Sequence, residues 1–306
     1  MVEYIGEHSP LDVIATDRIL LDTSSLPFDP LAAKRPSDAT VIAMEVLASI
    51  AIFIAVLYGV LVVVYKDEGA ILSATPLFLV YILLGGIIML CTVYLLSPDP
   101  TVGLCVGTVW CLAIGFSFLY GSLLVKNWRV AKILGGSSQK FFRQKISLLK
   151  MNLILLISLA GNILLLILFT VIDEPYVKHN QCQYSGAAEI LIWVILGWNA
   201  ALILPAVWIS WRTKHVRQNF NESKHIGWAT YNVTLVAVIL VAVLATSETV
   251  ETQYIILSIG IILGVTLTLT LLFIPKIIAA YHHLEVDEIN TVELRNTKTS
   301  GGTMSE

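Results

Sequence analysis

Side chains that could catalyse a reaction or bind a metal are few and scattered in this sequence. The six histidines lack the spacing of a ligand cluster, and they are His8, His179, His215, His225, His282 and His283. The Gly-x-Ser-x-Gly, His-Glu-x-x-His and P-loop motifs are absent. We therefore predict no catalytic residue, no metal site and no cofactor, and we expect that the chain is not an enzyme. The four cysteines remain, and their chemistry depends on the elements that position them.

Seven long apolar segments dominate the chain between residues 41 and 280. Of the 306 residues, 57% are hydrophobic and 13% are charged, unlike an average soluble protein. A helix of about 20 apolar residues crosses the hydrocarbon core of a bilayer. The predicted spans are 41–65, 77–96, 101–125, 151–172, 190–211, 229–246 and 254–280. The sequence thus predicts an all-α membrane protein, a seven-transmembrane helix bundle.

Basic residues are concentrated on one side of this predicted bundle. Fifteen of the 19 Lys and Arg residues lie in 66–75, 126–150, 212–224 and the stretch from 276 onward. Such an excess marks cytoplasmic segments. We therefore expect the N-terminus outside and the C-terminus in the cytoplasm of a multi-pass plasma-membrane protein. The basic residues also suit contacts with anionic membrane lipid.

Ionisable residues are missing from the middle of every predicted span. Glu45, Lys126 and Lys276 each lie near a span end. Pumps and ion-coupled transporters usually keep such residues at mid-membrane, so a transporter ranks low among the candidate functions. No feature of the chain suggests a nucleic-acid partner.

The cysteines divide by their predicted position. Cys105 opens the third span and Cys182 lies in the loop 173–189, both on the outer side. A disulfide between them is feasible in that oxidising compartment, with two free thiols as the alternative. Cys91 and Cys111 lie within spans, where a small apolar role is expected.

Four segments, in order, carry a resemblance to a known family. They are TPLFLVYILLGG before and within the second span, LCVGTVWCLAIGFSFLYGSLLVKNWRV over Leu104–Val130, NESKHIGWATYNV over Asn221–Val233, and FIPK ending at Lys276. Together they resemble class C G-protein-coupled receptors, closest to the metabotropic GABA-B type. The matching motif residues are Trp110, Tyr231, Asn232, Phe273, Pro275 and Lys276.

Some positions depart from the family pattern. Thr108 replaces a frequent basic residue of the third helix, and Asn199 replaces a Lys of the fifth. These changes put in doubt any pocket that relies on those charges, but not the fold. The chain also shows no counterpart of the coiled coil that pairs animal GABA-B subunits.

The resemblance implies a signalling mechanism and its partners. It implies a resting ion pair between Lys126 at the end of the third helix and Glu222 at the start of the sixth; two solvated side chains are the alternative. It also implies a heterotrimeric G protein as partner and a homo- or heterodimer with another class C subunit. The G-protein-facing residues would be Trp128, Arg129, Lys132, Lys140, Arg143, Lys145, Arg212, Lys214, Arg217 and Lys224.

The expected organisation has three parts. Residues 1–39 resemble the extracellular linker that leaves the ligand-binding domain of this family, 40–280 form the seven-transmembrane domain, and 281–306 form a short polar cytoplasmic tail. The expected function is to relay extracellular ligand binding to G-protein activation. The alternative is a non-signalling membrane subunit that pairs with or traffics a signalling receptor.

Overall fold

The computed structural model describes residues 36–65, 76–96, 99–134, 148–172, 175–178, 181–184, 186–212, 221–246 and 250–300. The side chains of some residues at element ends, among them 221–224 and 282–300, lie outside this description. The predicted linker 1–39 falls almost wholly outside it, with 36–39 as the exception.

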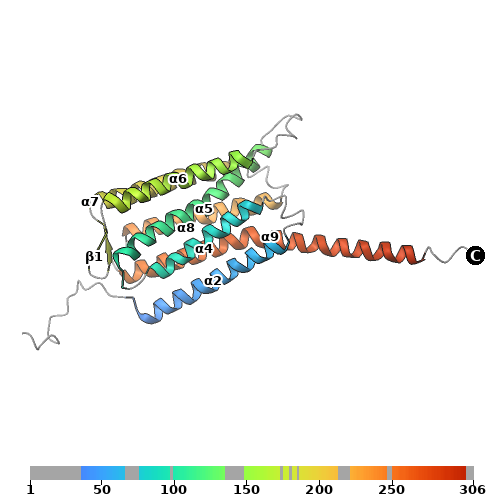
Figure 1. The fold of residues 1–306 in the computed structure, drawn as a ribbon, viewed down its shortest axis with the longest axis horizontal. Coiled ribbons are helices and arrows are strands. Elements are labelled where there is room, and N and C mark those ends of the chain that lie inside the picture. The colour runs from blue at the N-terminus through green and yellow to red at the C-terminus, as the bar shows by residue number, and fades with distance from the viewer. Residues whose placement is uncertain are drawn as a thin grey trace, which may run out of the picture. The chain divides into compact units, whose positions relative to one another are not determined.

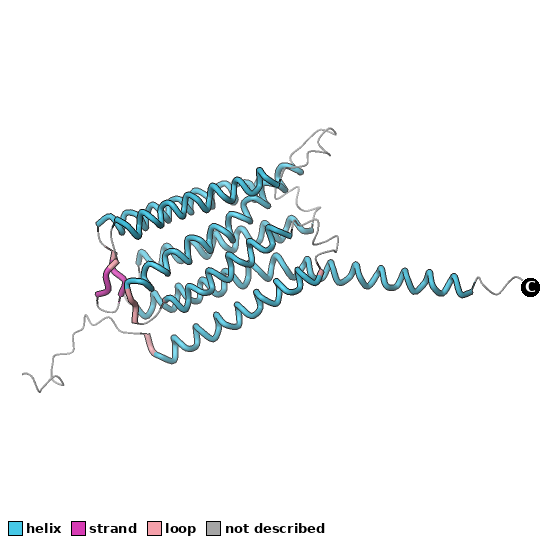
Figure 2. The backbone as a smooth tube through the Cα atoms, viewed as in Figure 1, coloured by secondary structure: helices cyan, strands magenta, loops and turns pink. Residues whose placement is uncertain are grey.

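The described part of the chain is an antiparallel bundle of helices (Figures 1 and 2). The helices are α2 (Asp38–Val64), α4 (Pro76–Leu95), α5 (Val102–Leu134), α6 (Leu148–Ile172), α7 (Gly186–Arg212), α8 (Asn221–Thr246) and α9 (Val250–Ser300). A small hairpin of β1 (Tyr176–Lys178) and β2 (Gln181–Gln183) lies between α6 and α7. All seven helices are long and apolar enough to cross a membrane. The predicted seven-helix bundle is therefore confirmed.

Several helices are longer than the apolar spans that predicted them. Helix α5 continues past residue 125 to Leu134, and α8 begins at Asn221 rather than at 229. Helix α9 is helical to Ser300, well into the predicted polar tail. An apolar run marks only the part of a helix that lies in hydrocarbon, whereas backbone hydrogen bonding continues into polar sequence.

Local signals explain where two of the helices begin. Ser37 precedes α2, and its hydroxyl accepts a hydrogen bond from the Thr40 backbone N–H at 3.2 Å. Thr101 does the same for α5, accepting from the Leu104 backbone N–H at 3.3 Å. These caps satisfy backbone donors that have no partner within the helix.

Helix α5 is the centre of the packing. It contacts α4, α6, α7 and α8, while α2 packs against α4 and α9 on the far side of α4. Helices α4 and α5 approach closely because Gly85 faces Gly115: a Cβ on Gly85 would lie 2.7 Å from the Gly115 carbonyl oxygen. Small residues at such crossings let helix backbones meet inside a membrane.

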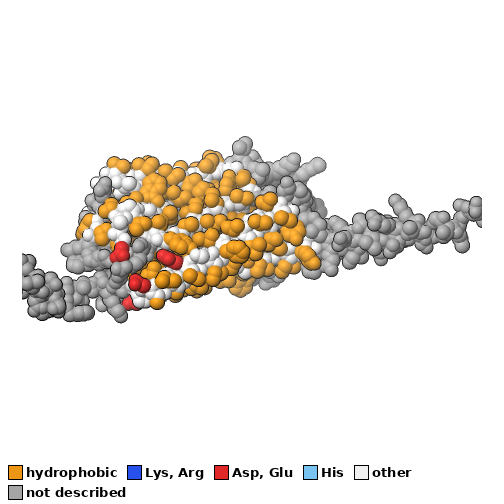
Figure 3. All heavy atoms as spheres, turned by 60° about the horizontal axis from the view of Figure 1, so that its bottom comes forward, with side chains coloured by type: hydrophobic (Ala, Val, Ile, Leu, Met, Phe, Trp, Pro, Cys, Tyr) orange, Lys and Arg blue, Asp and Glu red, His pale blue; other side chains and the backbone are white. Residues whose placement is uncertain are grey.

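The outer surface of the bundle is apolar (Figure 3). Large side chains such as Phe53, Leu204 and Leu263 are more than 60% exposed. Lipid tails, not water, are the solvent that such a surface requires. Helix α7 is the most outward-facing of the spans, with only 11% of its most apolar window buried.

Charged side chains divide between the two ends of the bundle. Among the described side chains, every Asp and Glu lies at the end of the bundle that carries the hairpin, and Figure 3 shows the acidic atoms gathered there. They are Asp38, Glu45, Asp99, Glu189 and Glu251. The described Lys and Arg side chains all lie at the opposite end, and they are Lys126, Arg129, Lys132, Lys150, Arg212 and Lys276. We call these two ends the disulfide end and the basic end.

Candidate functional site: a bundle with a cavity at one end and a buried lysine at the other

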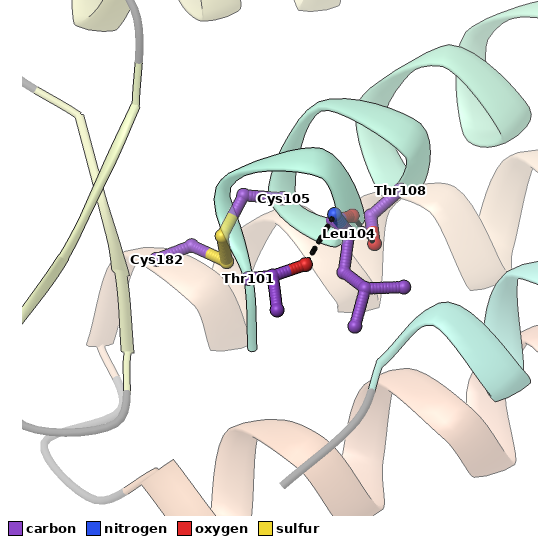
Figure 4. The surroundings of a disulfide bond; sticks show 5 residues. All are labelled: Thr101, Leu104, Cys105, Thr108 and Cys182. Atoms are coloured by element: carbon purple, nitrogen blue, oxygen red, sulfur yellow. Dashed lines mark hydrogen bonds between the residues drawn. A yellow bond between two sulfur atoms is a disulfide. The ribbon is translucent and has the colours of Figure 1, made fainter. Parts of the chain in front are cut away.

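The disulfide end is fixed to helix α5 by a covalent bond. Cys105, in the first turn after the Thr101 cap, is bonded to Cys182 of β2, with the two Cα atoms 5.7 Å apart (Figure 4). The bond joins residues 77 positions apart in sequence. The predicted disulfide is confirmed, and the described Cys91 and Cys111 are free thiols.

The hairpin that carries Cys182 also packs on the bundle through Tyr184. The Tyr184 ring lies 6.0 Å from the Phe169 ring of α6, centroid to centroid. Burial raises the pKa of the Tyr184 hydroxyl above its ordinary value. The hairpin is thus held by a disulfide on α5 and by an aromatic contact on α6.

A cavity of about 1090 Å³ lies beneath the hairpin, between α4, α5, α7, α8 and α9. Most of the residues around it are apolar, and both Cys182 and Tyr184 of the hairpin contribute to its lining. Its side-chain polar groups include Thr108, Asn199, Gln253 and Tyr254. Such a site favours a largely apolar ligand oriented by a few hydrogen bonds. Thr108 and Asn199, two of the positions that depart from the family pattern, both line this cavity.

Several side-chain hydrogen bonds hold α6 against its neighbours. The Trp110 indole N–H of α5 donates to the Thr170 hydroxyl at 3.0 Å. Deeper in the bundle, Asn162 of α6 donates to Ser117 of α5 at 2.6 Å and to the Asn199 side-chain oxygen of α7 at 3.0 Å. Asn199 donates back to Asn162 at 3.2 Å. Trp110 is thus a packing residue that joins two helices.

The motif residues of α8 and α9 differ in their contacts, and Asn232 joins the two helices. The Asn232 amide donates to the Gly264 carbonyl at 3.0 Å and to the Thr268 hydroxyl at 2.9 Å. The Tyr231 side chain instead faces outward, with 38% exposed. Phe273 is fully buried and stacks on Tyr58 of α2, with ring centroids 5.6 Å apart. Pro275 lies within helix α9.

The basic end contains two buried lysines. Lys126 is 5% exposed and Lys276 is 7% exposed. From the sequence, a lysine near the end of a membrane span is most simply a residue that extends its amine toward water. The structure instead buries both side chains among the helices, where a charged amine requires opposite charge or hydrogen-bond acceptors around it.

The residue after Lys126 bonds to α8. The Asn127 amide donates to the Thr230 hydroxyl at 2.7 Å. The residues predicted from the sequence include none of Asn127, Asn162 and Thr230. Asn and Thr in an apolar span are the signal that would have found them, because such groups need partners in the membrane.

The predicted G-protein-facing residues are described only in part. Lys132 lies 5.8 Å above the Trp128 ring, and Arg212 lies 5.2 Å above the Trp208 ring. Arg129 lies on the same last turns of α5. The described residues do not include Lys140, Arg143, Lys145, Lys214 and Arg217, nor the side chains of Glu222 and Lys224. The predicted Lys126–Glu222 ion pair therefore lies outside the description.

Comparison with known proteins agrees with this architecture. The family described as "7 transmembrane sweet-taste receptor of 3 GCPR" matches residues 35–276. Metabotropic glutamate receptor-like protein E of Dictyostelium discoideum is 28% identical over 325 residues, which cover 97% of this chain and 39% of that protein. Metabotropic glutamate receptor-like protein M of the same organism is 30% identical over 229 residues, 70% of this chain and 30% of that protein. The chain spans about a third to two fifths of these relatives.

Proposed function

Because this chain belongs to the class C family of seven-transmembrane G-protein-coupled receptors, we propose that its bundle relays ligand binding at the disulfide end to a heterotrimeric G protein at the basic end. It is a multi-pass membrane protein and a receptor, not an enzyme. The plasma membrane is the typical location of the family. The relay itself, the GABA-B-like subtype and the orientation with the basic end in the cytoplasm are parts of the proposal.

The observation that carries the proposal is the burial of Lys126 at the cytoplasm-facing end expected for α5. Lys126 is 5% exposed, so a carboxylate near its amine would stabilise the charge, and Glu222 lies in the first turn of α8 at the same end of the bundle. We assign Glu222 as that partner in the resting state. An outward shift of α8 separates the two charges and opens the basic end to the G protein.

The energy of such a pair is small but sufficient for switching. An exposed ion pair contributes about 0–1 kcal/mol, and exclusion of water strengthens the attraction. A change of about 1.4 kcal/mol shifts a two-state equilibrium tenfold. Loss of the Lys126 charge therefore raises the population of the open state without any ligand.

A dimer with a second class C subunit is part of the same proposal. The outward-facing side chains of α7 offer an apolar face, but lipid covers such a face equally well. Dimerisation is therefore supported by the family alone. Chemical crosslinking in native membranes tests it.

The first test is guanine-nucleotide exchange by a panel of G proteins in membranes that contain the chain. We expect higher basal exchange for Lys126→Ala than for the wild type. The double charge reversal Lys126→Glu with Glu222→Lys should return exchange toward the wild-type level. Lys150→Ala is the matched control, because Lys150 is an exposed lysine at the same end.

Two outcomes would contradict the proposal. Equal basal exchange for Lys126→Ala and Lys150→Ala would contradict the proposed resting ion pair between Lys126 and Glu222. No exchange from any variant, with surface expression confirmed, would favour the alternative of a non-signalling subunit. Retained pairing with a competent receptor would then identify that role.

A further inference from the structure

Helices α5 and α8 are joined by two hydrogen-bonded pairs that carry no charge. Asn127 bonds to Thr230, and the Tyr120 hydroxyl lies 3.1 Å from the Thr234 hydroxyl about one turn farther along α8. We propose that the Asn127–Thr230 pair is a second, neutral clasp that holds α8 against α5 in the resting receptor. The signalling consequence rests on the proposed function, whereas the clasp itself does not.

The direction of the hydrogen bonds follows from the Thr230 hydroxyl. Its one hydrogen is donated to the Ile226 carbonyl of its own helix at 2.8 Å. Its lone pairs are therefore left to accept from the Asn127 amide N–H at 2.7 Å. The Thr230 hydroxyl thus links α5 to the backbone of α8. Because its hydrogen is already donated to Ile226, it can only accept in the bond with Asn127.

The Tyr120–Thr234 pair is a second contact between α5 and α8. Thr234 donates to the Thr230 carbonyl at 2.7 Å. The Tyr120 hydroxyl lies 3.1 Å from the Thr234 hydroxyl and also reaches the Ile203 carbonyl of α7 at 3.5 Å. Two threonines of one face of α8 therefore each contact a polar side chain of α5. Both contacts depend on the register of the two antiparallel helices, because a shift along either axis breaks them.

Burial of the Asn127–Thr230 bond favours the arrangement in which α5 and α8 are packed together. Asn127 is 1% exposed and Thr230 is fully buried, so water does not compete for the bond while the helices are packed together. A rigid-body movement of α8 that separates Lys126 from the α8 terminus also breaks the neighbouring amide–hydroxyl bond. Asn127 is therefore a positioning residue for the buried lysine beside it.

The bonding of the Asn127 side chain also explains why the clasp can open. Within the described part of the chain, its amide oxygen is buried without a hydrogen-bond partner. An unmet buried acceptor costs free energy, and the resting arrangement carries that cost. A second arrangement of α5 and α8 that admits water to this oxygen removes that cost. The free energy lost on opening is therefore smaller than the free energy of the Asn127–Thr230 hydrogen bond alone.

The test measures the separation of the two helices directly. Spin labels are placed at Lys132→Cys on α5 and Trp228→Cys on α8, both exposed positions, in a Cys91→Ser, Cys111→Ser background that keeps the disulfide. Thr230→Val removes the hydroxyl and keeps the shape. We expect the open-to-closed ratio from the distance distribution to rise about three- to eighteenfold, the range for one interhelical hydrogen bond.

Two variants separate the clasp from a general packing effect. Thr230→Ser keeps the hydroxyl and should restore the wild-type distances. Thr170→Val is the matched control, since Thr170 also donates to its own helix, at 2.8 Å to Leu166, and accepts from α5, at 3.0 Å from Trp110. It joins α5 to α6 and should leave the α5–α8 distance unchanged. If Thr230→Val does not accumulate, Asn127→Ala is measured in its place.

The outcomes distinguish the clasp from the proposed function. Thr230→Val distances equal to those of the wild type would overturn the clasp, even where Lys126→Ala raises nucleotide exchange. A wider α5–α8 distance with no nucleotide exchange in any variant would support the clasp and contradict the signalling proposal. A wider distance together with higher basal exchange would support both.

Discussion

Asn162 of α6 and Asn199 of α7 form a reciprocal pair of amide hydrogen bonds inside the bundle, at 3.0 and 3.2 Å. Asn162 also reaches Ser117 of α5, so the pair joins three helices. The class C pattern that the sequence resembles has a lysine at position 199. In this chain Asn199 lies beside the cavity in place of that charged side chain, and its neutral amide joins two helices by hydrogen bonds.

Removal of one member of the amide pair should destabilise the bundle. Asn162→Leu leaves Asn199 without its reciprocal partner, and an unmet buried polar group costs about 1–3 kcal/mol. The double variant with Asn199→Leu should lose less than the sum of the two single losses, because neither amide is then left alone. Thermal unfolding in detergent measures all three variants. Strictly additive losses would mean that the two side chains do not interact.

Loss of the disulfide should loosen the hairpin and lower stability. Cys105→Ser removes a crosslink that closes a loop of 77 residues, and such bonds contribute about 2–4 kcal/mol. The double variant with Cys182→Ser should be no less stable than either single variant, because both lose the same bond. Cys91→Ser is the control, since Cys91 is a free thiol. Unfolding midpoints with and without reductant provide the measurement, and a reductant-insensitive wild type would contradict the prediction.

Gly85 should tolerate no larger residue. A Cβ there would meet the Leu119 backbone nitrogen and lie 2.7 Å from the Gly115 carbonyl oxygen. Backbone atoms cannot rotate away, so Gly85→Ala should force α4 from α5 and cost about 1–3 kcal/mol. Gly197→Ala is the matched control, because no heavy atom lies within 4 Å of its Cβ position. That change should be neutral or should stabilise α7 by about 0.5–1 kcal/mol. Equal stability of the two alanine variants would show that the close approach of α4 and α5 is not required.

Burial of Tyr184 predicts a loss of stability at alkaline pH. Because burial raises the pKa of its hydroxyl, the folded chain keeps this proton at a pH where the unfolded chain, with a pKa of about 10, has lost it. The stabilisation is therefore complete below about pH 10 and decreases as the pH rises above that value. Tyr184→Phe should lose less stability than the wild type as the pH rises above about 10. Tyr176→Phe is the control, because Tyr176 is at an exposed position of the same hairpin, and its stability should change with pH as that of the wild type does. If the stability of Tyr184→Phe changed with pH in the same way as that of Tyr176→Phe, the prediction would be wrong.

The sequence by itself determined the helices, their number among the described residues and the class of receptor. Long apolar runs specify membrane spans because a bilayer leaves no other way to satisfy the backbone. The disulfide was also predictable, since Cys105 and Cys182 fall on the same side of the predicted topology. The separation of acidic from basic side chains follows directly from the loop sequences.

The tertiary structure decided which faces of the helices meet. In lipid the outer surface is as apolar as the interior, so hydrophobicity does not mark the buried face of a span. For that reason the sequence could not show that Lys276 is buried, that Tyr231 faces outward, or that Asn127 meets Thr230. These contacts depend on the rotation and register of whole helices. Close glycine contacts such as Gly85 with Gly115, together with the hydrogen bonds of a few polar side chains, determine both.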